Sequence, residues 1–401
     1  MKSKIPLNIV PTISVIKNTS DSKECSPYDF IADNLSLYIH FPFCVAKCPF
    51  CPIKTYKYHN EMVNAYMASL LKEISSCLNV IGCHKINCVH FGGGTPSLMK
   101  NYQIESVLDV ISNYANIDDA EVLIEAHPEF ITEDTIDYLS GLKNCTINFG
   151  VQSFDNEILY LMKRQCNILD IVQKVNLAKE RGVSVGIDYI CDWPNSDQQR
   201  FDNDMKYIEE LQPEHISQYP LCWTADLDRF WSPNLNKESM KKRIELNRLC
   251  EEKLLSQGYS RYSTFHYQKE NTFTHKYGRN QLDGGRWIGF GAGAYTYLGN
   301  MLYVNSHVSE YMNGNLIFEQ VIFNYTERLI WEFIFLIRNR PIYKKDIIVK
   351  YGAITVGPLE TIITNLINKQ YIISDQDLSL TWEGIINIKS IEKIINNAFL
   401  K

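Results

Sequence analysis

The sequence has no long apolar run and no excess of positive charge. No stretch approaches the ~20 consecutive apolar residues that are needed to span a bilayer. Residues 1–25 hold no apolar core followed by a small-residue cleavage site. The 401 residues carry a formal net charge of −6. We therefore expect no membrane association and no binding to nucleic acid.

Closely spaced cysteines are also scarce, although the chain has twelve in total. Only Cys44, Cys48 and Cys51 lie together, in the spacing C-x3-C-x2-C, and the other nine form no second C-x2-C pair. Three thiolates leave a tetrahedral zinc site one ligand short, whereas thiolates are the usual ligands of iron–sulfur clusters. A disulfide with one spare thiol would be the alternative in a secreted protein. We favour one [4Fe–4S] cluster with an open iron, in a reducing cytoplasm.

Apolar periodicity indicates strands that alternate with helices from residue 35 onward. Such alternation is typical of parallel βαβ units and of an α/β fold. Strands are predicted at 35–41, 86–91, 121–126, 145–151, 183–190 and 215–221. Helices are predicted at 60–80, at 101–113, from Thr132, and at 154–163, 168–181 and 197–211.

Glycine and polar residues follow or end these strands. The run Gly92–Gly94 comes after the second strand, and glycine lets the backbone approach a ligand without interference from Cβ. Glu125 and Asp188 end later strands, and a buried Gln152 would need several hydrogen-bonding partners. Because parallel barrels place their chemistry at the carboxyl ends of the strands, we expect these residues to converge.

The pattern changes after residue 225. A charged helix is predicted at 236–257, and a loop rich in aromatic residues and histidine follows at 259–287. It contains Tyr262, His266, Tyr267, His275, Tyr277 and Arg279. Such a loop could cover a substrate and supply protons, but we interpret it as an exposed polar loop.

Residues 325–401 are predicted to form a separate domain. Helices are predicted at 325–338, 343–350 and 357–369, followed by two short strands with a turn near Gly384. The order resembles a winged helix, but its balance of charge is too weak for a surface that follows phosphates. The expected divisions are an extension at 1–34, a barrel at 35–225, a barrel extension and substrate-covering segment at 226–324, and this domain.

Several motifs together resemble one known family. They are YIHFPFCVAKCPFC, HFGGGTPS, EAHPE, GVQSF…KR, VGIDYICDWP, HISQYPL and GFGAGAY. The set is similar to the oxygen-independent coproporphyrinogen III oxidase-like branch of the radical S-adenosylmethionine (SAM) superfamily. The resemblance implies a partial (β/α)6 barrel with a C-terminal winged-helix-like α+β domain. It also implies a [4Fe–4S] cluster, two SAM molecules, and an electron donor such as flavodoxin or ferredoxin.

The resemblance assigns roles to individual residues. It places Cys44, Cys48 and Cys51 on the cluster. The residues that match contacts to one SAM or its neighbour are Tyr38, Gly93, Glu125 and Tyr295. Those that match contacts to the other SAM are Phe50, Gly94, Thr95, Gln152, Arg164, Asp188 and Cys222. Of these, Tyr38 and Phe50 are expected at the reaction centre.

The chain also departs from patterns within this branch. Pro52 and Ile53 follow the cysteine triplet, where the porphyrinogen oxidases carry a further cysteine two positions on. Asp192 and Trp193 replace a usual Gly-Leu pair, either to shape the SAM pocket or to pack a loop. The region from His275 lacks the spacing of the H-N-x-x-Y-W element of the heme chaperones.

These departures set the expected function. Our first interpretation is an enzyme that uses two SAM molecules for methylation or cyclopropanation at an sp2 carbon of a small molecule. The candidate acceptors are a tetrapyrrole, an aromatic heterocycle and a polyunsaturated chain. The alternatives are oxygen-independent coproporphyrinogen III oxidation and a heme chaperone.

Overall fold

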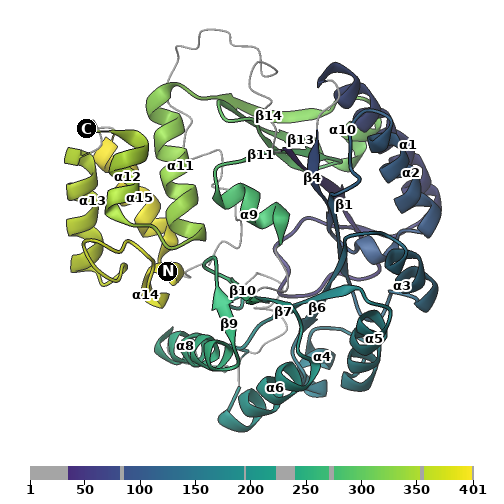
Figure 1. Cartoon of the computed structure of the whole chain (residues 1–401), viewed down its shortest axis with the longest axis horizontal. Coiled ribbons are helices and arrows are strands. Elements are labelled where there is room, and N and C mark those ends of the chain that lie inside the picture. Colours follow the sequence, from purple (N-terminus) through teal and green to yellow (C-terminus); the bar gives the residue numbers. More distant parts are fainter. Residues whose placement is uncertain are drawn as a thin grey trace.

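The computed structural model describes residues 35–81, 85–193, 196–222, 240–270, 275–352 and 356–399. The predicted extension at 1–34 lies outside these residues. Twelve strands form one sheet, which curves around a central helix (Figure 1). Six neighbouring strands run parallel and follow one another in chain order. They are β1 (Leu35–Phe41), β4 (Ile86–Gly93), β5 (Glu121–Ala126), β6 (Cys145–Gln152), β7 (Ser184–Tyr189) and β8 (His215–Gln218). The α/β partial barrel predicted from the sequence is confirmed.

Helices cover the outer face of these strands, and capping residues fix where several of them begin. The hydroxyl of Thr132 accepts a hydrogen bond from the Thr135 N–H at 3.1 Å, which starts the third helix. Asp197 accepts one from the Arg200 N–H at 2.9 Å in the same way. The helices are α1 (Asn60–Ile81), α2 (Asn101–Ser112), α3 (Glu133–Ser140), α4 (Asn156–Leu161), α5 (Ile168–Glu180) and α6 (Gln198–Leu211), with a 3-10 turn at Pro96–Leu98.

Further strands extend the sheet at both edges. Beyond β8 lie the antiparallel strands β10 (His266–Lys269) and β9 (Tyr259–Arg261), which follow α8 (Met240–Ser256). Beyond β1 lies β11 (Arg286–Phe290), which is parallel to β1. The antiparallel strands β12 (Tyr295–Tyr297), β13 (Met301–Asn305) and β14 (Ile317–Ile322) follow, with α10 (Val308–Met312) between the last two. Because β9 and β14 end the sheet without pairing to each other, the barrel is open.

A short helix, α9 (Lys276–Leu282), lies inside the curve of the sheet (Figure 1). The Lys276 N–H donates to the Glu121 carboxylate at 2.7 Å, and Asn280 donates to the Ser36 hydroxyl at 3.0 Å. These contacts tie the helix to β5 and β1. The predicted exposed loop at 259–287 is therefore wrong for this part, which fills the interior of the barrel.

The C-terminal unit is helical nearly throughout. It consists of α11 (Tyr325–Asn339), α12 (Lys344–Tyr351), α13 (Val356–Asn368), α14 (Trp382–Ile386) and α15 (Ile388–Phe399). In place of the two strands predicted there, the described residues form two isolated bridges, Ile372–Leu380 and Tyr343–Asp377. Gly384 lies within α14 rather than in a turn, because Thr381 caps that helix by accepting a hydrogen bond from the Gly384 N–H at 3.1 Å.

The C-terminal helices contact two separate parts of the barrel domain. On one side Trp331 of α11 stacks on Tyr297 of β12, with ring centroids 4.3 Å apart. On the other side the indole of Trp382 donates to Glu251 of α8 at 2.9 Å. Among the described residues, no helix is long and apolar enough to cross a membrane.

Candidate functional site

One cavity of about 830 Å³ opens at the carboxyl ends of the parallel strands. Parallel barrels bind their ligands at this end. Every predicted site residue except Cys222 lines it. These residues are Tyr38, Cys44, Cys48, Phe50, Cys51, Gly93, Gly94, Thr95, Glu125, Gln152, Arg164, Asp188 and Tyr295. Cys222 is buried just after β8 and does not line the cavity. The convergence expected from the strand ends is observed, whereas the individual roles stay predictions.

The three clustered cysteines lie on a loop held between two short strands. β2 (Phe43–Cys44) pairs in parallel with β3 (Tyr56–Lys57), so the loop leaves and rejoins the same part of the wall. Cys44, Cys48 and Cys51 are half-buried free thiols, and the Thr95 hydroxyl donates to the sulfur of Cys44 at 3.3 Å. Burial raises the pKa of the Cys51 thiol to about 12. Binding to iron would offset this cost, since metal ligands are thiolates. The loop thus fits a cluster held by three cysteines.

The glycine run lets the end of β4 pack closely against the end of β1 and the start of β2. The Gly94 N–H donates to the Phe41 carbonyl at 2.8 Å, and a Cβ on Gly94 would lie 2.6 Å from the Phe43 carbonyl oxygen. Gly93 has φ of +115°, a conformation open chiefly to glycine. No side chain therefore fits at Gly94 without moving the backbone, and the main chain itself forms the cavity wall.

Two carboxylates, Glu125 of β5 and Asp188 of β7, give the cavity its charge. Glu125 accepts hydrogen bonds from the Gly93 N–H at 3.1 Å and interacts with the His90 ring at 3.1 Å. Burial raises the pKa of Glu125, but the hydrogen bond and charge of His90, with the Gly93 bond, lower it more. Burial raises the pKa of Asp188 to about 6, although Asn148 donates to it at 2.8 Å. Glu125 is thus ionised near neutral pH and can accept hydrogen bonds from hydroxyl groups.

The end of β6 carries unusual backbone geometry. Gln152 has φ of +74°, in a region that non-glycine residues rarely occupy. The Arg164 guanidinium donates to the Gly150 carbonyl just before it. Conformations of this kind concentrate at ligand sites, where the surroundings hold them.

Four histidine rings that are far apart in the sequence lie together inside the barrel, and three of them, His90, His266 and His275, line the cavity. His215 of β8 stacks on His275, which caps α9, at 4.9 Å between ring centroids, and His90 lies 5.8 Å from His275. His266 of β10 lies 5.5 Å from His215. Burial lowers the pKa of His266 to about 4, and it also holds the pKa of His275 well below its usual range. Sequence reasoning missed His90 and His215. His90 could have been predicted from the sequence, because it lies two residues before Gly92 and therefore on the same face of the strand.

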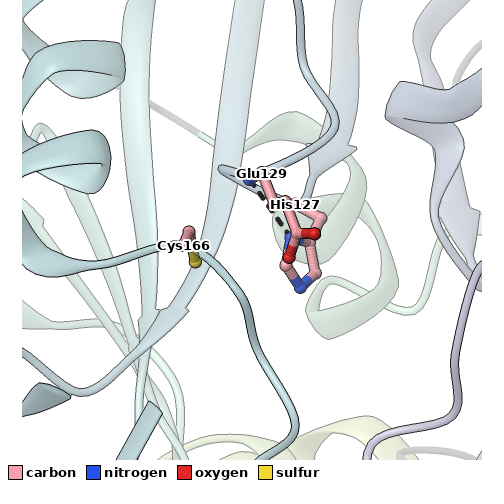
Figure 2. A group of neighbouring side chains, drawn as sticks. All are labelled: His127, Glu129 and Cys166. Atoms are coloured by element: carbon pink, nitrogen blue, oxygen red, sulfur yellow. Dashed lines mark hydrogen bonds between the residues drawn. The ribbon is translucent and has the colours of Figure 1, made fainter. Parts of the chain in front are cut away.

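His127, Glu129 and Cys166 form a second group on the cavity side, at a spacing that could hold a metal ion (Figure 2). Nδ1 of His127 accepts a hydrogen bond from the Glu129 N–H at 3.2 Å. Burial and the neighbouring Arg164 lower the pKa of His127 to about 2. The Gln165 N–H donates to the Glu129 carboxylate at 3.1 Å, so these side chains also join the loop after β5 to the segment that holds Cys166.

Comparison with known proteins agrees with this geometry. Residues 38–208 match the Radical SAM superfamily. The heme chaperone HemW of Bacillus subtilis is 25% identical over 366 residues, which cover 87% of this chain and 96% of that protein. HemW of Buchnera aphidicola (subsp. Schizaphis graminum) is 29% identical over 297 residues, 70% of this chain and 76% of the relative.

Oxidases of the same branch match as well. The oxygen-independent coproporphyrinogen III oxidase of Escherichia coli is 32% identical over 188 residues, 46% of this chain and 41% of that protein. The structure of coproporphyrinogen III oxidase (HemN) from Escherichia coli superposes with a TM-score of 0.78 at 20% identity, over 92% of both chains. That likeness concerns the fold. With the cysteine loop, the glycine run and the carboxylates in place around one cavity, the chain belongs to the radical SAM superfamily, in its oxygen-independent coproporphyrinogen III oxidase-like branch.

Proposed function

We propose that this chain binds heme and SAM together, as a heme chaperone of the radical SAM superfamily. The observation that carries the proposal is the near full-length similarity to HemW, which extends over 96% of the Bacillus subtilis protein. The relatives named above are heme chaperones and coproporphyrinogen oxidases, and none is a methyltransferase. They favour the alternatives from the sequence over methylation or cyclopropanation.

The residues around the cavity are compatible with the cofactors of this superfamily. Cys44, Cys48 and Cys51 would hold the [4Fe–4S] cluster, and Glu125 would accept hydrogen bonds from hydroxyl groups of SAM. If SAM is cleaved here, as the two enzymatic alternatives require, the bound cluster would supply the electron for that cleavage. The chain's own contribution is to orient SAM and to keep water away from it.

The buried imidazoles supply suitable groups for heme. His266 and His275 both line the cavity, and burial keeps them neutral by lowering the pKa of each ring. Neutral imidazole is the form that binds iron. The volume of about 830 Å³ is at the upper end of ordinary ligand sites, which reach ~1,000 Å³.

A heme titration under anaerobic conditions tests the proposal. The chain with its cluster reconstituted should bind one heme per chain, and His275→Ala should shift or abolish the Soret band of the complex. His59 is exposed, so His59→Ala is the matched control and should bind heme as the unaltered chain does. Binding that is no tighter in the unaltered chain than in His275→Ala, or no binding at all, would refute a heme site in this cavity.

Coproporphyrinogen III oxidation is the second candidate, favoured by the 32% identity to the Escherichia coli enzyme. Pro52 and Ile53 stand against it, because the further cysteine of those oxidases is missing. Products distinguish the candidates when the chain is incubated with SAM, dithionite and the porphyrinogen. Oxidation predicts 5′-deoxyadenosine with CO2, methyl transfer predicts 5′-deoxyadenosine with S-adenosylhomocysteine, and a chaperone predicts heme binding without product.

A further inference from the structure

Trp193 is a buried side chain between two parts of the cavity wall. It follows β7 and is 3% exposed. Its ring meets Phe50 edge to face, with centroids 5.4 Å apart and planes at 86°. Phe50 lies between Cys48 and Cys51 on the cysteine loop. The side chain therefore supports that loop directly.

The indole of Trp193 also reaches the end of β6. Its Nε1–H donates to the Gln152 carbonyl at 3.3 Å, and the Ile190 N–H donates to the same oxygen at 3.0 Å. Gln152 is the residue with φ of +74°, and its side chain lines the cavity. Two donors on one carbonyl hold a peptide that would otherwise relax to a more common conformation.

Asp192, the residue before Trp193, fixes the main chain at this position. Asp192 is 2% exposed and accepts hydrogen bonds from the Leu221 N–H at 2.7 Å and from the Arg243 guanidinium at 2.7 Å. Arg243 in turn donates to the Leu221 carbonyl at 2.6 Å. A buried carboxylate with a bound guanidinium and a backbone donor has little freedom to move. The main chain at Trp193 is thus fixed to α8 and to the segment after β8.

We propose that Trp193 is a positioning residue, whose indole fixes the cysteine loop relative to the end of β6 that faces the ligand. Phe50 and Gln152 belong to distant parts of the chain, and Trp193 contacts both. A shift of about 1 Å between a bound cluster and SAM is enough to impair their reaction. The departure at 192–193 from the usual Gly-Leu pair therefore has a use in this chain. The inference rests on cluster and SAM binding, and it holds whether or not the cavity takes heme.

Graded variants of Trp193 test the proposal in the reconstituted full chain. Trp193→Phe keeps a ring against Phe50 and loses the hydrogen bond to Gln152, so SAM binding should weaken about threefold. Trp193→Leu loses the aromatic contact as well and should weaken SAM binding about tenfold. The electron paramagnetic resonance spectrum of the reduced cluster should change less on addition of SAM in Trp193→Leu than in the unaltered chain.

Two controls separate positioning from general damage. Trp331→Phe alters a buried tryptophan of the C-terminal unit and should leave the SAM dissociation constant and the spectrum unchanged. The double variant Phe50→Leu, Trp193→Leu should weaken SAM binding by a factor smaller than the product of the factors for the two single variants, since both act through one contact. Unchanged SAM binding and spectra in Trp193→Phe and Trp193→Leu would overturn the proposal. If Trp193→Leu does not fold, an unchanged Trp193→Phe overturns it alone. The heme titration is an independent measurement, so either proposal can fail without the other.

Discussion

Replacing Glu73 with glutamine should destabilise the chain and loosen the glycine-rich segment that lines the cavity. Glu73 lies on α1 with 8% exposure and accepts three hydrogen bonds. The donors are the Gly291 N–H at 2.8 Å, the Asn305 amide at 2.8 Å and the Tyr311 hydroxyl at 2.6 Å. The Asn305 amide also donates to the Gly291 carbonyl at 3.0 Å. One carboxylate thus holds the turn between β11 and β12 together.

The expected magnitude follows from this geometry. Glutamine keeps one acceptor oxygen for Gly291 and Tyr311, but its new NH2 group faces the amide donor of Asn305. Turning the Asn305 amide round would relieve that conflict and break its bond to the Gly291 carbonyl. The variant loses a hydrogen bond to a charged group and strands a buried donor or acceptor, which costs about 2–4 kcal/mol in the free energy of unfolding.

Urea denaturation followed by circular dichroism measures this cost, and hydrogen exchange measures the local effect. The midpoint should fall for Glu73→Gln, and the amides at 291–294 should exchange faster. Glu310→Gln is the matched control, because that carboxylate is exposed, and its midpoint should not move. A Glu73→Gln midpoint equal to that of the unaltered chain, with unchanged exchange at 291–294, would show that the carboxylate does not hold this turn.

Three further outcomes are expected. Cys48→Ala should lose the visible absorbance of the reconstituted cluster, whereas Cys77→Ala on α1 should keep it; equal iron content in both would refute the assignment. Burial raises the pKa of Asp188 to about 6, so the carboxylate loses its charge as pH falls below that value. SAM affinity, measured by equilibrium dialysis, should then fall up to about tenfold per pH unit, and Asp188→Asn should flatten the profile. Arg338→Met removes the 2.7 Å contact of Arg338 with the buried Glu392 and leaves that carboxylate with Lys389 at 3.2 Å, so it should lower the unfolding free energy by about 1.5–3 kcal/mol; an unchanged urea midpoint would contradict this.

The local sequence pattern was enough to predict the barrel and most of the residues around its cavity. The parallel strands are short buried runs bounded by polar turns, so their positions can be read from apolar periodicity. Parallel strands end at one edge of the sheet, which is why Gly93, Glu125 and Asp188 were expected together and are found around one cavity. Cys222 was placed by resemblance alone, and the buried turn after β8 keeps it away from the cavity.

Contacts between distant segments account for what was missed. His275 and Tyr277 belong to a polar stretch that looks exposed, but they pack against the rings of His215 and His90 inside the barrel. Glu73 resembles any polar residue on a helix, and its Gly291 partner is 218 positions away. The helix at 388–399 was not among the predicted helices, and its apolar face packs on α11 and α13.

The open sheet with its C-terminal brace has a consequence for how the protein is made. Helices α11 to α15, which contact α8 and β12, are synthesised after every strand of the sheet among the described residues. Translation at ~5–20 residues per second leaves the strands without that brace for several seconds. Every residue that lines the cavity precedes residue 325, so a nascent chain stalled there should already carry the cavity lining and all three cluster cysteines, without the helices that contact β12 and α8. Cofactor loading would then not have to wait for the C-terminal helices.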